Sequence, residues 1–195
     1  MRGRFRRNPT TLGTAGCTGT YLTLVFEPGN FAVRRNHAVK GRNDSMELRE
    51  FFSEDAIKLN LEGTAKDDIL RELIGLLQLD EKSDGMLFKM LKRRENLGST
   101  GIGRGIAIPH CRSLVVNKLR VAFGRKKEGV DFKAIDEKPV HFFFLIVAPP
   151  LEVSNQYLPV LGKIAQFSKE SDVPARLLEL TEPKQFLALL EEKGV

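Results

Sequence analysis

The sequence predicts an α/β domain in which a mixed β-sheet is flanked by helices. From Met46 onward, strand-like and helix-like stretches alternate. Residues 140–147 are apolar on both faces, which is typical of a central strand that is buried on both sides. Three helical stretches then close the chain. The element order is β-α-α-β-β-β-α-α-α, and it favours a single domain over residues 46–195 with helices packed on the sheet.

Periodicity predicts the first half of this domain. Residues 56–61 alternate apolar and polar side chains, as a half-buried strand does, with Ile57, Leu59 and Leu61 on one face. Thr64 stands three residues before Asp67, which indicates a capping box. Two helices are expected next. Their apolar residues at helical spacing are Ile69, Leu70, Leu73, Ile74, Leu76 and Leu77 in the first helix and Met86, Leu87, Met90 and Leu91 in the second, which ends near 96–98.

Glycines and prolines divide the second half. Gly101, Gly103 and Gly105 predict a flexible loop before a short strand at 106–108, which Pro109 ends. The elements expected before the central strand are a strand over 119–123, a connection over 124–129 and an acidic turn over 131–139. The closing helices are expected over 154–168, over 172–180, and after Thr181 as N-cap with Pro183 in the first turn.

The basic charge lies outside this domain. A net charge of +6 and a pI near 9.4 are compatible with nucleic-acid binding. However, residues 1–45 hold eight Lys/Arg and two Asp/Glu, whereas residues 46–195 hold 23 of each. The domain itself is therefore neutral, and nucleic acid is not expected to be its partner.

Residues 1–45 show no sustained period, although residues 20–26 are compatible with one strand. The flanks 10–20 and 28–43 are rich in Gly, Thr, Asn and Arg, which is typical of loop or disorder. The segment is either a basic arm that binds phosphates, or an organellar transit peptide, or an extension that is not native to the folded unit. We favour the last, because the well-patterned sequence begins at Met46.

Several protein classes are excluded. Two cysteines cannot form a disulfide framework, and no residues have metal-ligand spacing. The longest strongly apolar run, residues 142–148, is far shorter than the ~20 residues that span a bilayer. The first 45 residues lack the layout of a signal peptide. We therefore expect a cytoplasmic protein without membrane insertion or a bound metal.

The most informative stretch is Arg93–His110, RRENLGSTGIGRGIAIPH. It lacks the Gly-Lys-Ser/Thr of a nucleotide-binding loop, and no strand precedes it as in a dinucleotide fingerprint. Backbone N–H groups at glycines can turn toward an anion, and Arg94, Ser99 and Thr100 are suitable donors to phosphate. A neutral imidazole such as His110 can carry a phosphoryl group. From these residues alone, a simple surface turn with a surface histidine is an equally good interpretation.

Together with Gly129-Val130-Asp131-Phe132, Ala134-Ile135-Asp136 and the strand ending at Ala148-Pro149, this stretch resembles the signature of type-2 enzyme IIA domains. These domains belong to the bacterial phosphoenolpyruvate:sugar phosphotransferase system (PTS), in its mannitol/fructose and nitrogen-regulatory class. The resemblance covers residues 46–195 and implies an α/β fold. It also implies a phosphohistidine carrier or regulator that needs no organic cofactor. The implied donor is the phosphocarrier HPr or its nitrogen-branch relative, and the implied targets are a IIB domain or regulatory proteins.

The resemblance also assigns roles to residues. It implies that His110 accepts the phosphoryl group and that Arg94 stabilises its charge. Residues implied to shape the phosphate loop or contact phosphate are Glu95, Ser99, Thr100, Gly101 and Gly103. Tyr157 stands where the family usually has a second histidine, and its phenol can donate a hydrogen bond but cannot take up charge. The alternative function is therefore a phosphotransfer-impaired regulatory binding module of the same fold.

Other residues of this region have simpler interpretations. Cys111, where the family commonly has glycine, is expected to be a small residue at a strand end. His141 and Phe142–Phe144 are expected to be structural, Lys126 and Lys127 to lie in a solvated turn, and Pro159 to delay the start of its helix to Leu158 or later. Ile102, Ile106 and Leu114 line either a partner surface or the core. A nitrogen-regulatory role is favoured over a sugar-specific one, because nothing in the sequence marks a sugar partner.

Overall fold

The computed structural model describes residues 20–27, 30–37, 47–150 and 155–195. The chain divides into two compact units, residues 1–45 and 46–195. In the first unit, β1 (Thr20–Glu27) and β2 (Asn30–His37) form an antiparallel pair. β1 agrees with the sequence analysis, in which residues 20–26 are compatible with one strand. β2 corrects the expectation of a loop there, because pairing with β1 provides backbone hydrogen bonds that a search for sequence periodicity does not detect.

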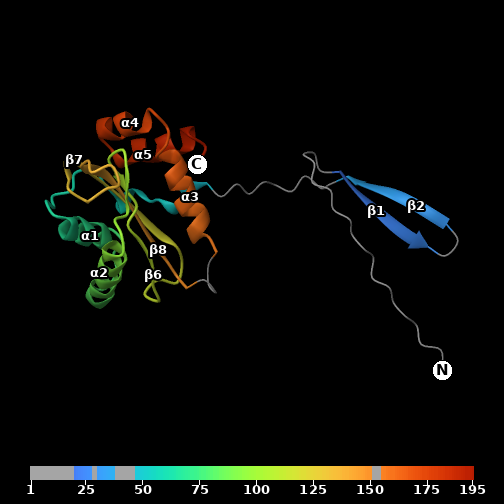
Figure 1. Cartoon of the computed structure of the whole chain (residues 1–195), viewed down its shortest axis with the longest axis horizontal. Coiled ribbons are helices and arrows are strands. Elements are labelled where there is room, and N and C mark those ends of the chain that lie inside the picture. The colour runs from blue at the N-terminus through green and yellow to red at the C-terminus, as the bar shows by residue number, and fades with distance from the viewer. Residues whose placement is uncertain (1–19, 28–29, 38–46, 151–154) are drawn as a thin grey trace, which may run out of the picture. The chain divides into compact units, whose positions relative to one another are not determined.

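The second unit is a mixed six-stranded sheet with helices on both faces (Figure 1). Its elements are η1 (Leu48–Phe51), η2 (Glu54–Ala56), β3 (Ile57–Lys58), α1 (Lys66–Gly75), α2 (Glu81–Asn96), β4 (Gly101–Gly103), β5 (Ile106–Ala107), β6 (His110–Arg112), β7 (Arg120–Val130), β8 (Val140–Ala148), α3 (Tyr157–Phe167), α4 (Val173–Glu179) and α5 (Pro183–Glu192). The strand order is β3-β7-β8-β5-β4, and β6 also pairs with β8. β7 runs antiparallel to β8, while β5 and β6 run parallel to it. The predicted fold class is confirmed.

β8 is the central strand and is buried along both faces, as its apolar run predicts. Phe142, Phe144 and Ile146 pack in a core with α3, α4 and α5. Phe143, Leu145 and Val147 alternate with them and pack in a second core with α1 and α2. Successive strand residues point to opposite faces, so the one strand supplies both cores.

Strands β3 and β7 differ from their predicted extents. β3 has only two residues, and Leu61 packs in the second core whereas Ile57 and Leu59 pack in the first, so the three do not share one face. β7 continues through the predicted connection at 124–129. There Gly124 is a close-packing site, since a Cβ on it would lie 2.7 Å from Leu61 Cδ1. Lys126 is likewise in the strand and donates to the Glu62 carbonyl at 3.1 Å, rather than lying in a solvated turn.

The helix starts also need correction. Ala65 is the N-cap of α1, and the Asp68 carboxylate accepts its N–H at 3.2 Å, so Thr64 and Asp67 do not form the capping box. α5 has Pro183 in its first turn as predicted, but the helix begins at Pro183 with Glu182 as N-cap, one residue later than the predicted N-cap Thr181. α3 starts at Tyr157 and accommodates Pro159, because the first N–H groups of a helix have no intrahelical acceptor. Met86, expected on an apolar face, is 43% exposed.

A buried guanidinium links the sheet to α4. Arg125 of β7 is 2% exposed, and its donors bond only backbone carbonyls among the described residues. These carbonyls belong to Leu59, Leu177, Leu178 and Leu180. The last three lie at the C-terminal end of α4, where a positive charge complements the helix dipole.

Gly101–Gly103 forms strand β4 rather than a flexible loop. β4 and β5 are joined by a two-residue turn in which Arg104 and Gly105 have φ values of +56° and +75°. Such a turn matches the twist of a β-hairpin. The Arg104 guanidinium donates to the carbonyls of Ser168 and Lys169, which fixes the hairpin against the end of α3. In 47–150 and 155–195, no helix has both the length and the hydrophobicity needed to cross a bilayer.

Candidate functional site

His110 is the first residue of β6 and lies beside Ile146 of β8. Its Nδ1 atom is 2.7 Å from the Ile108 carbonyl oxygen, and its Nε2 atom accepts a hydrogen bond from Arg94 Nε at 3.2 Å. A carbonyl can only accept, so this network assigns the proton to Nδ1 and the lone pair to Nε2. Nε2 is therefore the ring nitrogen that carries the lone pair in this arrangement.

The imidazole is half-buried, and burial is the main cause that lowers the pKa of His110 below its ordinary value. The hydrogen bond to Ile108 opposes this fall, the positive charge of Arg94 adds to it, and the negative charge of Glu95 opposes it. The neutral form, which carries the nucleophilic lone pair, is therefore favoured near pH 7.

Arg94 lies in the last turn of α2. Besides its contact with His110, its guanidinium donates to the Gly98 carbonyl at 2.9 Å. The sequence places a positive charge where α2 ends, and the loop carbonyl then fixes its direction. The result is a cation beside Nε2, close to where the negatively charged oxygens of a phosphoryl group on that atom would lie.

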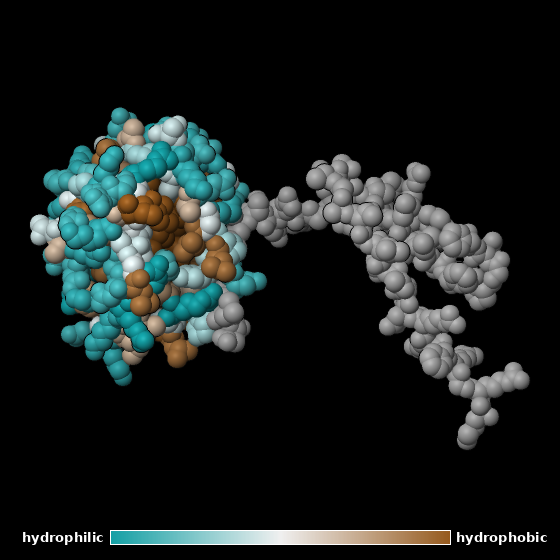
Figure 2. Space-filling model, viewed as in Figure 1, coloured by the Kyte–Doolittle hydropathy of each residue, from teal (hydrophilic) through white to brown (hydrophobic). Residues whose placement is uncertain are grey.

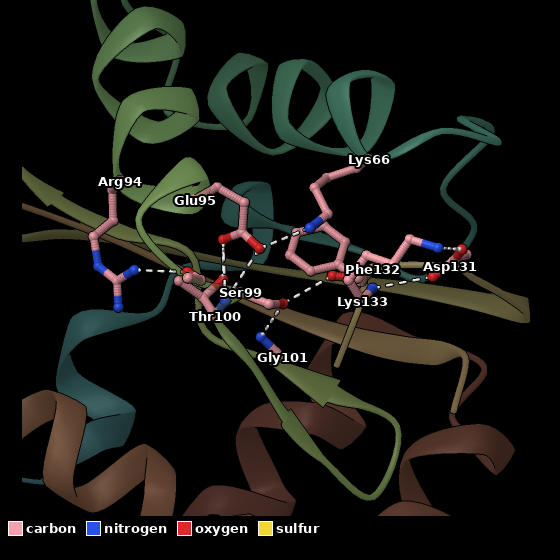
Figure 3. A network of polar contacts seen from close by, with 10 residues as sticks. Lys66, Arg94, Glu95, Ser99, Thr100, Gly101, Asp131, Phe132 and Lys133 are labelled. Atoms are coloured by element: carbon pink, nitrogen blue, oxygen red, sulfur yellow. Dashed lines mark hydrogen bonds and ion pairs between the residues drawn. The ribbon is translucent and has the colours of Figure 1, made fainter. Parts of the chain in front are cut away.

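Glu95 points into the domain and organises the loop after α2 (Figure 3). Its carboxylate accepts the Thr100 N–H at 3.1 Å, the Thr100 hydroxyl at 2.7 Å and the Lys66 ammonium at 2.9 Å. The Lys66 ammonium also lies 4.4 Å from the centre of the Phe132 ring. The structure thus places Glu95 and Thr100 in a buried network that shapes the loop.

Ser99 and the two glycines also have partners within the protein. The Ser99 hydroxyl donates to the Phe132 carbonyl at 2.8 Å and accepts the Gly101 N–H at 3.1 Å (Figure 3). A Cβ on Gly101 would lie 2.7 Å from Ala134 Cβ, and Gly103 has a φ of +87°. Close packing and turn geometry therefore explain why glycine stands at these positions.

Tyr157 faces His110 from the first position of α3. The two ring centres are 6.0 Å apart, with planes inclined at 59°. Burial is the main cause that raises the pKa of the Tyr157 phenol, so the group remains a neutral hydrogen-bond donor. The Arg112 guanidinium lies 4.5 Å from the centre of the Tyr157 ring. The sequence analysis missed Arg112, although its position two residues after His110 puts both on one face of β6.

The remaining candidates are structural or exposed. Cys111 is buried in the core with α1 and α2, and burial raises the pKa of its thiol to about 12, as suits a small residue in a strand. His141 Nδ1 lies 3.0 Å from the Lys127 carbonyl oxygen, in agreement with a structural role. Ile106 is buried in the core, whereas Ile102 and Leu114 are 44% and 87% exposed. Apolar side chains on one face of the unit are seen in Figure 2.

Known sequences give an independent comparison. The profile of a family described as "Phosphoenolpyruvate-dependent sugar phosphotransferase system, EIIA 2" matches residues 50–193. A fructose-specific PTS EIIABC component of Bacillus subtilis is 35% identical over 136 residues, which are 69% of this chain and 21% of that protein. This chain thus spans about a fifth of that relative's length. A nitrogen regulatory protein of Pseudomonas aeruginosa is 33% identical over 132 residues, 67% of this chain and 85% of that protein.

Solved structures agree. The nitrogen regulatory protein IIA-Ntr from Neisseria meningitidis is 30% identical, with a TM-score of 0.64 over 73% of this chain and 98% of that one. The IIA mannitol protein of Escherichia coli, solved in complex with phosphorylated IIB, is 21% identical with a TM-score of 0.58 over 72% of this chain and 97% of that one, and it supports the fold alone. The resemblance found in the sequence is confirmed: the chain belongs to the EIIA 2 family of the phosphoenolpyruvate-dependent sugar phosphotransferase system.

Proposed function

We propose that residues 46–195 form a phosphohistidine carrier or regulator of a phosphotransferase system, with His110 as the phosphoryl acceptor. Family membership supports a phosphocarrier or regulator role. The observation that carries the specific proposal is the pair of bonds on the imidazole, which holds the proton on Nδ1 and places the lone pair of Nε2 beside the Arg94 guanidinium. The proposal assigns no role to residues 1–45. We propose that the protein acts in the cytoplasm.

The proposed step is a transfer between two histidines. Arg94 first releases its hydrogen bond to His110 Nε2 and turns to the phosphoryl oxygens, and the freed Nε2 lone pair attacks the phosphorus of a phosphohistidine on an HPr-like donor protein. The new P–N bond forms as the donor's P–N bond breaks, and that electron pair returns to the donor's imidazole. The Nδ1 proton remains on His110, hydrogen-bonded to the Ile108 carbonyl. Arg94 and the Tyr157 hydroxyl are proposed to donate to phosphoryl oxygens, and a IIB domain or a regulatory protein then takes or senses the group.

The alternative is a regulatory binding module that transfers poorly. It is favoured by Tyr157, which faces His110 with a phenol that stays neutral and therefore adds no positive charge. In that case the protein acts chiefly by binding a regulatory target. The relatives include nitrogen regulatory proteins as well as a fructose-like EIIA component of similar coverage, so the names of the relatives are compatible with either a regulatory or a sugar-specific role.

Phosphoenolpyruvate-dependent labelling tests both functions. The chain is incubated with phosphoenolpyruvate, enzyme I and HPr or its nitrogen-branch relative. We expect an acid-labile label on wild type that is lost in His110→Ala and kept in the matched control His141→Gln. Absence of label on wild type, or a label that survives His110→Ala, contradicts the carrier function. A large rate increase in Tyr157→His favours the regulatory module, and no increase shows that the phenol is adequate.

A further inference from the structure

The Tyr157 ring faces His110 at 6.0 Å between ring centres. Gln156, the N-cap of α3, makes no capping side-chain bond, so Tyr157 starts a helix without a side-chain cap. Its ring packs partly on the core with α3, α4 and α5. The direction of the hydroxyl therefore depends on what holds the ring.

Arg112 is the charged residue that contacts this ring. Its guanidinium carbon lies 4.5 Å from the ring centre, and its Nη1 atom donates to the Pro149 carbonyl at 2.8 Å, just beyond the end of β8. Arg112 is paired with Ala148 in the same strand register that pairs His110 with Ile146. The strand that carries the imidazole thus also carries the group that stacks on the phenol.

Helix stability does not explain this placement. A positive charge is unfavourable at a helix N-terminus because the helix dipole is positive there. Tyr157 is the first residue of α3, yet the charges of Arg112 and Arg94 both act on its phenol. A cation stacked on an aromatic face is attracted by the ring quadrupole, and this fixes both groups relative to each other.

We infer that Arg112 is a positioning residue of the transfer site: it holds the Tyr157 ring so that the phenol hydroxyl points to the phosphoryl group on His110. This inference rests on the proposed function. Arg112 acts through Tyr157, whereas Arg94 contacts the imidazole directly. In this arrangement the hydrogen-bond donor is the neutral Tyr157 hydroxyl, whereas the positive charge is on the Arg112 guanidinium at the face of the ring.

A double-mutant cycle tests the inference. The variants of the full chain are Arg112→Gln, Arg112→Lys, Tyr157→Phe and the double variant Arg112→Gln/Tyr157→Phe, with the phosphorylation rate measured at saturating HPr. Arg112→Gln is expected to slow the rate about threefold to tenfold, as loss of a cation–π contact would, without changing the HPr concentration for half-maximal rate. Arg112→Lys is expected to restore part of it, and in the Tyr157→Phe background Arg112→Gln should have no further effect. Equal slowing with and without the phenol would overturn the inference.

A titration separates this inference from the proposed function. The chain has two tyrosines and no tryptophan, so Tyr21→Phe leaves Tyr157 as the only tyrosine absorbance signal. Because the positive charge of Arg112 opposes the rise in the pKa of Tyr157, Arg112→Gln should raise that pKa further. The matched control is Arg71→Gln, which removes a guanidinium stacked 3.8 Å from the Phe88 ring centre, and it should leave the pKa unchanged. If wild type takes no phosphoryl group, the proposed function fails, and an unchanged pKa in Arg112→Gln overturns the stacking itself.

Discussion

Replacing Glu95 with alanine should destabilise the domain far more than an ordinary ion-pair deletion. Glu95 is 7% exposed, and its carboxylate accepts from the Thr100 N–H, the Thr100 hydroxyl and Lys66. Each buried polar group left without a partner costs about 1–3 kcal/mol, and Thr100 loses the acceptor of two such groups. The Lys66 side chain is 24% exposed, so water offsets part of its loss. Deleting one partner of a buried pair typically costs ~3–5 kcal/mol, and we expect a loss in that range.

The chain offers a matched control for this measurement. Lys92 and Asp67 also join α2 to α1 through an ion pair, but their side chains are 48% and 42% exposed. Asp67→Ala should therefore cost no more than about 1 kcal/mol. The assay is urea unfolding followed by circular dichroism, with the free energies of unfolding of both variants compared with wild type. If the free energy of unfolding falls in Glu95→Ala by an amount within about 1 kcal/mol of its fall in Asp67→Ala, Glu95 contributes no more than an exposed ion pair does, and the reasoning is refuted.

Three further predictions concern buried groups. Arg125→Met leaves the carbonyls at the end of α4 without donors and should lower the free energy of unfolding by ~3 kcal/mol or more in urea titrations. The pKa of His110, followed by NMR, should lie below 6.5 in the folded protein and rise in Arg94→Gln. Because the unfolded state takes up a proton at a higher pH than the folded state, the free energy of unfolding should fall as the pH drops through 6.5 and on through the folded pKa. A folded-state pKa above 6.5 would contradict this prediction. In a Cys17→Ser background, Cys111 should react with a thiol reagent at about pH 8 only after unfolding, because burial keeps its thiol protonated, and rapid labelling of the native protein would show that the thiol is accessible.

The fold class was predictable because hydrophobic periodicity reflects burial. The apolar run of β8 reflects burial on both faces, and the helical spacing of α1 and α2 reflects burial on one face, so the pattern alone reveals them. Gly124 misled the prediction, because a glycine that admits a close neighbour has the same sequence signal as a glycine in a turn. The short β3 was overestimated because Leu61 continues the alternation after the chain has left the strand.

The candidate site was predictable only in part. The loop sequence identified His110 and Arg94 as candidates, and the structure brings them together at 3.2 Å. It could not reveal that Glu95 and Thr100 bond each other in the interior, because a buried carboxylate and an exposed one look alike in a sequence. Contact between Arg112 and Tyr157 joins residues that lie far apart in the chain, and such long-range pairs depend on the topology that places α3 beside β6.

The alternating side chains of β8 have a consequence for how the unit is held together. Phe144 belongs to one core and its neighbour Phe143 to the other, so neither group of helices possesses a hydrophobic interior of its own. If one helical layer unfolds, the β8 side chains that face it lose their packing partners, and the strand on which the other layer packs is destabilised. The two helical layers should therefore unfold in one cooperative transition, and His110, whose short strand pairs with β8, should keep its geometry until that transition occurs.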